Sequence, residues 1–278
     1  MNISPPLNGI HQWLCGASRK CQFKGMTAQE TINHLSSLSY RRRVPQSEIT
    51  GAVNLVFNTE IATTERPREP KPLGWQKKAT ERIHEDNYTT VQDLIEMSDV
   101  HPSDIDQRAL IECLFPDPNG LICIARHLDW GGSFTGTLVE HQHLDQAQYI
   151  VPCFMTAREG LTSKGTLSPR AKSITGERRY IVLDFDDPPS DHHPSIIRWL
   201  MGTRAPVLVI SSGNKSLHAW YATETPDRDA QFWRLAIMAG ADDALQKNHA
   251  QAVRLPMGIR DNGNRQSVIY FNPNNLPA

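Results

Sequence analysis

Two aspartates at the end of a predicted strand are the residues of this chain that most clearly point to chemistry. Residues 180–186 are rich in β-branched and aromatic side chains, which favours a strand. Side chains alternate between the two faces of a strand, so Asp184 and Asp186 project from the same face. Two carboxylates at this spacing repel each other unless a cation lies between them, and Mg²⁺ or Mn²⁺ is the usual one. The alternative is a strand that runs into an acidic, solvated turn.

A second group of polar residues follows the next predicted strand, residues 206–210. Ser212 and Gly213 are small enough to let backbone N–H groups approach an anion, and Lys215 can meet phosphate as a point charge. The alternation of a strand then resumes and places His218 on one face. A lone histidine is more often a buried core residue, but the turn before this one favours a phosphate ligand.

A third group lies farther along the chain. Thr225 is the predicted N-cap of a helix whose apolar stripe ends at Gly240. Asp242 follows directly, and Arg254 and Arg260 flank a turn that contains proline and glycine. This group therefore adds a carboxylate and two cations to the acid pair and the polar turn.

In this order, the three groups resemble the motifs of the archaeo-eukaryotic primase-polymerase (AEP) superfamily. Its members carry two acids on one strand, a histidine on the next strand and a third acid after a helix. The closer resemblance is to the replication primases of phages, plasmids and mobile elements. The matching segments are residues 178–186, 212–220, 240–242 and 251–266. The resemblance thus covers the C-terminal part of the chain and depends on four motifs in the same order.

The resemblance implies that the acids bind metal. Asp184 and Asp186 would hold two catalytic divalent cations, Mg²⁺ or Mn²⁺, and Asp242 would complete the acidic site. Two such ions activate an attacking 3′-hydroxyl and stabilise the leaving pyrophosphate, so no covalent nucleophile is needed. Two departures from the family pattern concern these residues. Asp187 is an additional acid after the pair, and Asp243 leaves the third ligand open between two neighbours.

The resemblance also implies that the polar turn and the arginines bind the nucleotide. His218, with Lys215 and Ser212, would hold the triphosphate of the incoming nucleotide. Arg254 or Arg260 would hold phosphate or template. Asn214 stands where many relatives have glycine.

The function implied is that of a DNA primase or primase-polymerase, a nucleotidyltransferase that joins nucleoside triphosphates on a single-stranded DNA template. The family type places it in the replication of a mobile element, with a replicative helicase as a further partner. Two alternatives stay open: a non-catalytic module that binds DNA or a helicase, and a metal-dependent nuclease, since paired acids serve hydrolysis equally well.

The elements that must position these residues indicate two domains. Residues 1–58 contain apolar residues at helical spacing and predict a small helical domain. Residues 59–80 are polar, contain three prolines and predict a linker. Residues 81–278 form the predicted catalytic domain, for which the resemblance implies an α+β fold: a mixed sheet with an RRM-like palm, flanked by helices.

Local signals in the first half of the catalytic domain are weaker. Thr90 and Ser103 are the predicted N-caps of two helices. Residues 121–125 and 148–155 predict strands, separated by a glycine-rich segment, residues 130–136. Residues 156–177 are polar and basic without an apolar period, which indicates either a segment that closes over the nucleotide or template, or disorder.

The charge and composition of the chain neither establish nor exclude nucleic-acid binding. The formal net charge is −1, yet residues 1–80 hold eleven Lys and Arg against five Glu, while the rest holds 18 against 25. A basic N-terminal part fits a surface that grips template, and it is equally common in ordinary proteins. Three consecutive arginines, Arg41, Arg42 and Arg43, could touch a phosphate backbone or form a solvated turn.

Cysteines and hydropathy bear on the cellular location and on zinc. The five cysteines show no C-x-x-C pair and no Cys/His cluster with zinc spacing. The sequence contains neither an 18-residue apolar run nor a basic and apolar leader. We therefore expect no membrane association and a cytoplasmic protein with reduced thiols.

Overall fold

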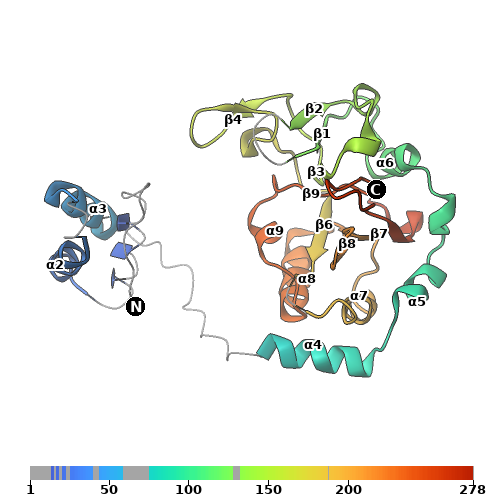
Figure 1. Cartoon of the computed structure of the whole chain (residues 1–278), viewed down its shortest axis with the longest axis horizontal. Helices are drawn as coiled ribbons and strands as arrows, with labels where there is room; N and C mark the ends of the chain where they lie inside the picture. The colour runs from blue at the N-terminus through green and yellow to red at the C-terminus, as the bar shows by residue number, and fades with distance from the viewer. Residues whose placement is uncertain are drawn as a thin grey trace. The chain divides into compact units, whose positions relative to one another are not determined.

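The computed structural model describes residues 14–15, 17–18, 21–22, 26–39, 44–58, 75–127, 132–186 and 188–277. Contacts divide the chain into two compact units, Met1–Lys71 and Pro72–Ala278. The elements of both units carry the labels of Figure 1. Among the described helices, none has both the length and the hydrophobicity that crossing a membrane requires.

The N-terminal unit is helical in its described residues. Helices α2 (Ala28–Ser39) and α3 (Gln46–Asn58) pack on each other around a small apolar cluster. The buried members of that cluster are Leu14, Leu35, Ile49, Ala52 and Val53. A capping box closes the start of α2: the backbone N–H of Thr27 donates to Glu30 at 2.8 Å, and the N–H of Glu30 donates to the Thr27 hydroxyl at 3.3 Å. Arg41, Arg42 and Arg43 lie outside the described residues.

The second unit begins with helices that differ in part from expectation. Helix α4 (Trp75–Asp86) starts inside the predicted linker, residues 59–80. Among the described side chains of this helix, Ile83 is the one that joins the apolar core, so its sequence holds too few core residues to show an apolar period. Helix α5 (Val91–Glu96) has the predicted N-cap, Thr90, within a complete capping box.

Helix α6 (Gln107–Leu114) begins later than predicted because its N-cap is Asp106. Ser103 lies instead in a 3₁₀ turn, η2 (Pro102–Asp104), where its N–H donates to the His101 ring. The helix still buries Leu110, Ile111 and Leu114. The apolar stripe was therefore sufficient to predict the helix but not its first residue.

A first antiparallel sheet has the strand order β2-β1-β3-β9. Its strands are β1 (Ile122–Ala125), β2 (Ser133–Gly136), β3 (Tyr149–Ile150) and β9 (Val253–Arg254). The glycine-rich segment predicted as a connection contains strand β2, which pairs with β1 from Ile122↔Gly136 to Ala125↔Ser133. The predicted strand at 148–155 is only two residues long in the structure. The 3₁₀ turns η3 (Leu138–Glu140) and η4 (Leu144–Gln146) connect β2 to β3.

A second antiparallel sheet has the strand order β10-β7-β8-β6. Its elements in chain order are β6 (Tyr180–Asp184), α7 (His193–Met201), β7 (Leu208–Ser211), β8 (Leu217–Ala222), α8 (Pro226–Met238), α9 (Ala244–Lys247), β10 (Val268–Phe271) and the 3₁₀ turn η6 (Pro273–Asn275). The last strand joins β7 at one edge, and β6 forms the other edge. The order of elements is that of a β-α-β-β-α-β unit, but the structure does not confirm an RRM-like palm for the sheet as a whole.

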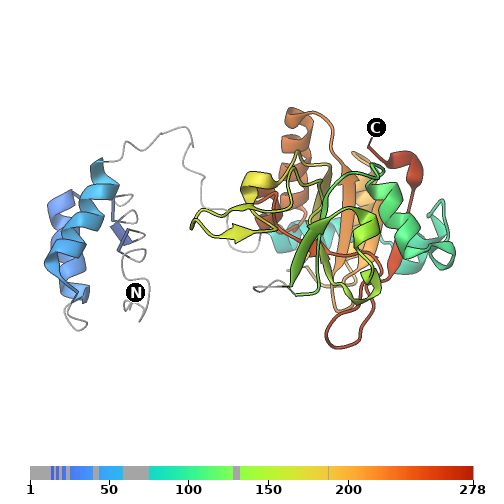
Figure 2. The same cartoon turned by 90° about the horizontal axis from the view of Figure 1, so that it is seen from above.

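The core of this unit is continuous. One apolar cluster contains residues of both sheets and of helices α4 to α9, with Tyr180, Phe185 and Trp220 among its large buried side chains. Figure 1 shows the two sheets in the middle and upper part of the unit with α4, α7 and α8 below them, and Figure 2 gives the view from above. The α+β class agrees with the prediction. The predicted mixed sheet does not, because every described strand pair in the two four-stranded sheets is antiparallel.

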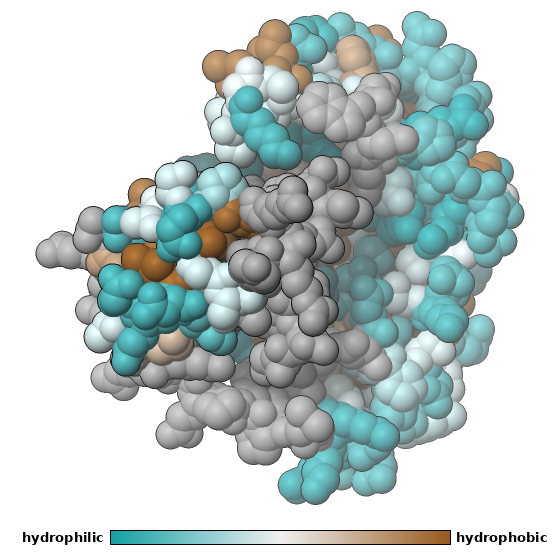
Figure 3. Space-filling view, turned by 60° about the vertical axis from the view of Figure 1, so that its left-hand side comes forward, coloured by the Kyte–Doolittle hydropathy of each residue, from teal (hydrophilic) through white to brown (hydrophobic). Residues whose placement is uncertain are grey.

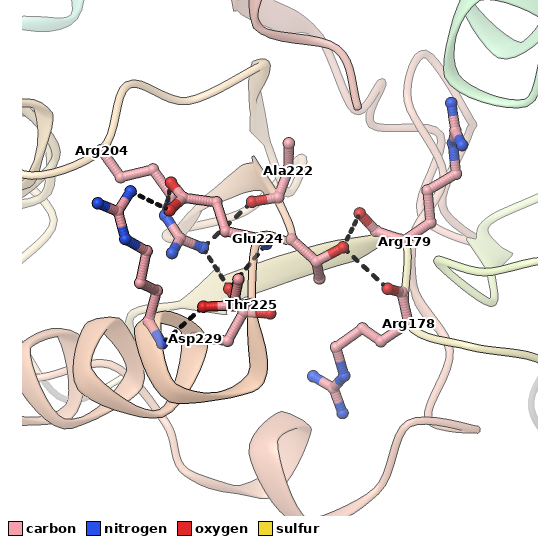
Figure 4. Close-up of polar contacts among 9 residues, drawn as sticks. Arg178, Arg179, Arg204, Ala222, Glu224, Thr225 and Asp229 are labelled. Carbon is pink, nitrogen blue, oxygen red and sulfur yellow. Dashed lines mark hydrogen bonds and ion pairs between the residues drawn. The ribbon is translucent and has the colours of Figure 1, made fainter. Parts of the chain in front are cut away.

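A buried arginine holds the turn between β8 and α8 (Figure 4). The guanidinium of Arg204 contacts Glu224 at 3.2 Å and Asp229 at 2.8 Å, and it donates to the backbone oxygen of Ala222 at 3.1 Å. It also lies over the ring of Phe232, 4.6 Å from the centroid. Helix α8 begins here with the predicted N-cap, Thr225. The network therefore fixes the start of the helix that leads to Asp242.

Residues 156–177, for which the sequence left disorder as one alternative, contain secondary structure. They form a hairpin of β4 (Gly160–Leu161) and β5 (Leu167–Ser168), followed by the 3₁₀ turn η5 (Lys172–Ile174). Leu161 and Leu167 are exposed on this hairpin. In the space-filling view of one face (Figure 3), such exposed hydrophobic residues form small groups among hydrophilic ones.

Candidate active site

A cavity of about 690 Å³ lies at the ends of β6, β7 and β8. Seven of the eight residues predicted for the catalytic and nucleotide-binding site line it. They are Asp184, Asp186, Ser212, Lys215, His218, Arg254 and Arg260. The acids come from the end of β6, the polar turn from the β7–β8 connection, and the arginines from β9 and the loop after it. Distant parts of the sequence thus meet around one volume.

The side chains of Asp184 and His218 form the buried end of the site. The two residues are direct cross-strand neighbours in the pairing of β6 with β8. Nε2 of His218 lies 3.2 Å from Oδ2 of Asp184, and both side chains are largely buried. Burial raises the pKa of Asp184, but the interactions with His218, Ser216 and the Phe185 backbone together outweigh it, so the pKa lies below its usual value. The carboxylate is therefore ionised at neutral pH.

Two buried atoms of this pair have no hydrogen-bond partner in the described structure: Oδ1 of Asp184 and Nδ1 of His218. A buried carboxylate oxygen is rarely left without a partner. An oxygen atom of this kind is the ligand that Mg²⁺ and Mn²⁺ prefer. The donor set at the acid pair therefore fits a hard divalent cation.

The sequence predicted Asp186 within the strand, but in the structure it lies beyond the end of the strand. Strand β6 ends at Asp184, and Asp186 is an exposed residue in the bend that follows. Its carboxylate still borders the same cavity. The strand alternation used to pair the two acids does not extend to Asp186, because the chain turns before the two prolines. Asp187 lies outside the described residues.

A buried histidine that the sequence did not single out shapes this bend. His193, at the start of α7, lies 3.0 Å through Nε2 from the backbone oxygen of Pro188, and its Nδ1 accepts from the N–H of Leu217 at 3.3 Å. Burial lowers the pKa of His193, which favours the neutral ring that these two bonds require. His193 thus links the loop after the acids to the start of β8.

The polar turn between β7 and β8 is closed by its own hydrogen bonds. The N–H of Ser212 donates to the backbone oxygen of Ser216 at 2.9 Å, and the two hydroxyls lie 3.2 Å apart. Gly213 has a φ of +73°, a conformation that glycine adopts readily. Lys215 is exposed and lines the cavity. The turn therefore presents a small, cation-bearing loop opposite the acids.

The two arginines are oriented by neighbours that sequence reasoning missed. Arg260 donates to the backbone oxygen of Ser212 at 3.0 Å, which joins its loop to the polar turn. Arg254 lies over the ring of Tyr149 at 4.4 Å and contacts the side chain of Gln148 at 3.5 Å. Gln148 is buried and also donates to Asp261 at 2.8 Å. A single glutamine at the start of a strand carries no sequence signal of this role.

The third predicted acid, Asp242, contacts the site through its backbone. Its N–H donates to the backbone oxygen of Asp184 at 2.9 Å. Its carboxylate accepts from the N–H of Ala244 at 3.0 Å, where α9 begins, and it is not among the residues that line the cavity. Asp243 is the N-cap residue of α9. The structure therefore brings the Asp242 backbone to the acid pair without bringing its side chain into the cavity.

Comparisons with known proteins give one weak structural match and no sequence match. No protein-family model matches the chain, and no curated protein shows a significant match. Among solved structures, the AEP domain of the primase-polymerase (PrimPol) of cyanophage S-2L matches with 15% sequence identity and a TM-score of 0.37. The match covers 62% of this chain and 97% of that chain. A likeness at this level does not establish a family, so the function must be argued from the side chains of the cavity.

Proposed function

We propose that this protein is a DNA primase-polymerase that joins nucleoside triphosphates on a single-stranded DNA template by two-metal phosphoryl transfer. The observation that carries the proposal is that one cavity contains two kinds of charged group. Asp184 and Asp186 supply carboxylates, and Lys215, Arg254 and Arg260 supply positive charge. A nucleoside triphosphate with bound metal needs both kinds, because its phosphates require cations and its metals require carboxylates. The size of the cavity also suits such a ligand.

In this proposal the two acids bind metal and His218 positions one of them. Asp184 and Asp186 would hold Mg²⁺ or Mn²⁺, and when bound these ions activate the attacking 3′-hydroxyl and stabilise the leaving pyrophosphate. His218 fixes the orientation of Asp184 through the contact at 3.2 Å. That contact favours a positioning role for His218 over the predicted direct contact to phosphate. Asp242 would act through its backbone contact to Asp184.

The cationic residues would hold the triphosphate. Lys215 is an exposed point charge on a small turn, and Ser212 lies beside it. Arg254 is held in place by Tyr149 and Gln148, so little side-chain freedom remains to be lost when it binds phosphate. Four motifs of the replication primases of mobile elements support the same reading, with residues 81–278 as the catalytic domain and residues 1–58 as a separate helical domain.

The experiment is incorporation of labelled nucleotides on single-stranded DNA, with and without an annealed primer, in Mg²⁺ and in Mn²⁺. The double variant Asp184→Asn/Asp186→Asn should abolish incorporation while the circular dichroism spectrum stays unchanged. The matched control is Asp104→Asn/Asp145→Asn, which removes the same charge at exposed positions outside the cavity and should retain activity.

The outcomes separate the proposal from its rivals. Products that form without a primer identify a primase, and products that need one identify a polymerase. Metal-dependent shortening of the DNA that is lost in the Asp184→Asn/Asp186→Asn variant would instead identify a nuclease. If the wild-type protein binds DNA but neither extends nor cuts it, the proposal fails and a binding module takes its place.

A further inference from the structure

A second cavity, of about 510 Å³, lies between the β4–β5 hairpin and the segment that leads from α9 to β9. We call it the hairpin pocket. One wall belongs to residues 161–172, which run from the hairpin to the start of η5, and the other wall belongs to residues 248–252. The hairpin pocket and the active-site cavity share no lining residue in the described part of the chain.

Both walls of the hairpin pocket rest on the same apolar cluster. Ala171 of the first wall is buried in this cluster, and Ala252 of the second wall packs against it. The hydroxyl of Ser173 donates to the backbone oxygen of Leu161 at 2.9 Å, which ties η5 to β4. The two walls are therefore held at a fixed separation by the core of the unit.

The groups that line the hairpin pocket are those that bind anions. Arg170 and Lys172 are cationic, and none of the described lining residues is acidic, a histidine or a cysteine. Hydroxyl and amide groups come from Thr162, Ser163, Asn248 and Gln251. Side chains of these types make most protein contacts to the phosphates and sugars of nucleic acids. A triphosphate is accompanied by metal ions that need carboxylates, so this pocket is better suited to a phosphodiester.

A neighbouring histidine is affected by the same positive charge. His249 follows Asn248 in the second wall. Burial lowers the pKa of His249 most, and the positive charges of Arg178 and Lys172 lower it further. The surroundings of the hairpin pocket therefore carry a positive potential, which attracts phosphate groups.

The hairpin pocket adjoins the active-site cavity along the chain. Ala252 borders the pocket, and Arg254 borders the cavity. Two residues of an extended chain span at most about 7 Å, so the two walls come at least this close at β9. One polynucleotide strand can therefore contact the pocket and the cavity at the same time.

We propose that the hairpin pocket binds the phosphate backbone of the single-stranded DNA that enters the active-site cavity. The inference rests on the proposed function for the identity of the strand. Arg170 and Lys172 supply the charge for the phosphates, and the exposed Leu161 beside them offers a nucleobase an apolar surface. Contacts to phosphate carry no sequence information, so this binding is independent of the DNA sequence.

The test measures how tightly the full-length protein binds a fluorescent single-stranded oligonucleotide at several salt concentrations. In the variant Arg170→Gln/Lys172→Gln we expect binding at least about tenfold weaker, and a slope of log affinity against log salt concentration that is reduced by about 0.7 for each lost phosphate contact. The matched control Lys78→Gln/Arg234→Gln removes one lysine and one arginine at exposed positions on α4 and α8, which lie below the sheets in Figure 1, whereas the hairpin lies above them. This control should bind DNA like the wild type.

A second titration uses a nucleoside triphosphate without DNA. Its affinity should be unchanged in Arg170→Gln/Lys172→Gln, because the lining residues of the active-site cavity are intact. An equal loss of nucleotide affinity would mean that the hairpin pocket serves the free nucleotide, and it would overturn the inference. Lys172→Gln alone changes an exposed residue and should show about half the change in slope, so it tests the pocket even if the loss of Arg170 disturbs folding.

The outcomes also separate this inference from the proposed function. DNA affinity that is unchanged in Arg170→Gln/Lys172→Gln, or equally reduced in Lys78→Gln/Arg234→Gln, overturns the inference even if the wild type incorporates nucleotides. A wild type that does not bind single-stranded DNA overturns it as well. If the wild type binds DNA through this pocket but incorporates no nucleotide, the proposed function fails and the hairpin pocket remains a DNA-binding site.

Discussion

Replacing Gly213 with alanine tests whether the neighbouring loop shapes the polar turn of the cavity. Gly213 has a φ of +73°, and an ordinary L residue in that region pays about 1–2 kcal/mol. An added Cβ would also lie 2.9 Å from the backbone oxygen of Arg265 and 3.1 Å from Cδ of Arg260. A backbone oxygen cannot swing aside like the end of a side chain, so the turn or the loop must shift.

Such overpacking costs about 1–3 kcal/mol in addition. We therefore expect Gly213→Ala to lower the free energy of unfolding by roughly 2–5 kcal/mol. The matched control is Gly165, whose φ is +75° but whose added Cβ would meet nothing within 4 Å. Gly165→Ala should lower the free energy of unfolding by only about 1–2 kcal/mol, which is the cost of the backbone conformation. The difference between the two variants isolates the contact with Arg265.

The assays are urea denaturation and titration with a nucleoside triphosphate. Because the turn carries Ser212 and Lys215, its displacement should weaken nucleotide binding at least tenfold in Gly213→Ala, which corresponds to about 1.4 kcal/mol. Gly165→Ala should bind the nucleotide like the wild type. The reasoning is refuted if both variants lose the same stability, or if Gly213→Ala binds the nucleotide with unchanged affinity.

Two further predictions concern stability. Arg204→Ala leaves the carboxylates of Glu224 and Asp229 without their buried partner and should cost about 3–5 kcal/mol in urea denaturation. Arg228 is exposed and also contacts Glu224, so Arg228→Ala should lower the free energy of unfolding by less than about 1 kcal/mol. Equal losses of stability in Arg204→Ala and Arg228→Ala would contradict this reasoning. Burial lowers the pKa of His141 in the folded protein, so the unfolded chain takes up a proton first as the pH falls below about 6.5. The free energy of unfolding should therefore decrease as the pH is lowered below that value, and it should decrease less steeply in His141→Gln. Identical slopes of the free energy of unfolding against pH in the wild type and the variant would exclude this role of His141.

The sequence predicted well those features of the structure that depend on residues close together in the chain. The predicted N-caps at Thr90 and Thr225 depend on contacts within a few residues, and both are present. The strand carrying Asp184 and the strand carrying His218 were predicted from their own residues. The pairing of these two strands, with Asp184 opposite His218, was not predicted.

Contacts between distant residues could not be predicted in this way. No local pattern reveals that Gln148 orients Arg254, or that His84 stacks on His192. The pairing of β10 with β7 likewise depends on competition between sheet edges, which a single strand sequence does not encode. The Asp242 side chain was predicted as a metal ligand from the family resemblance, and no sequence pattern revealed that one of its carboxylate oxygens accepts from the N–H of Ala244.

The strand that carries Asp184 is an edge strand, and an open edge can recruit the backbone of another chain. In this protein both ends of that edge are covered. The N–H of Asp242 donates to the Asp184 backbone oxygen, and the guanidinium of Arg178 donates to the backbone oxygen of Leu245 at 2.8 Å. The segment after α8 therefore also protects the sheet from adding a foreign strand, and variants that loosen it should aggregate through the same edge that carries the acid pair.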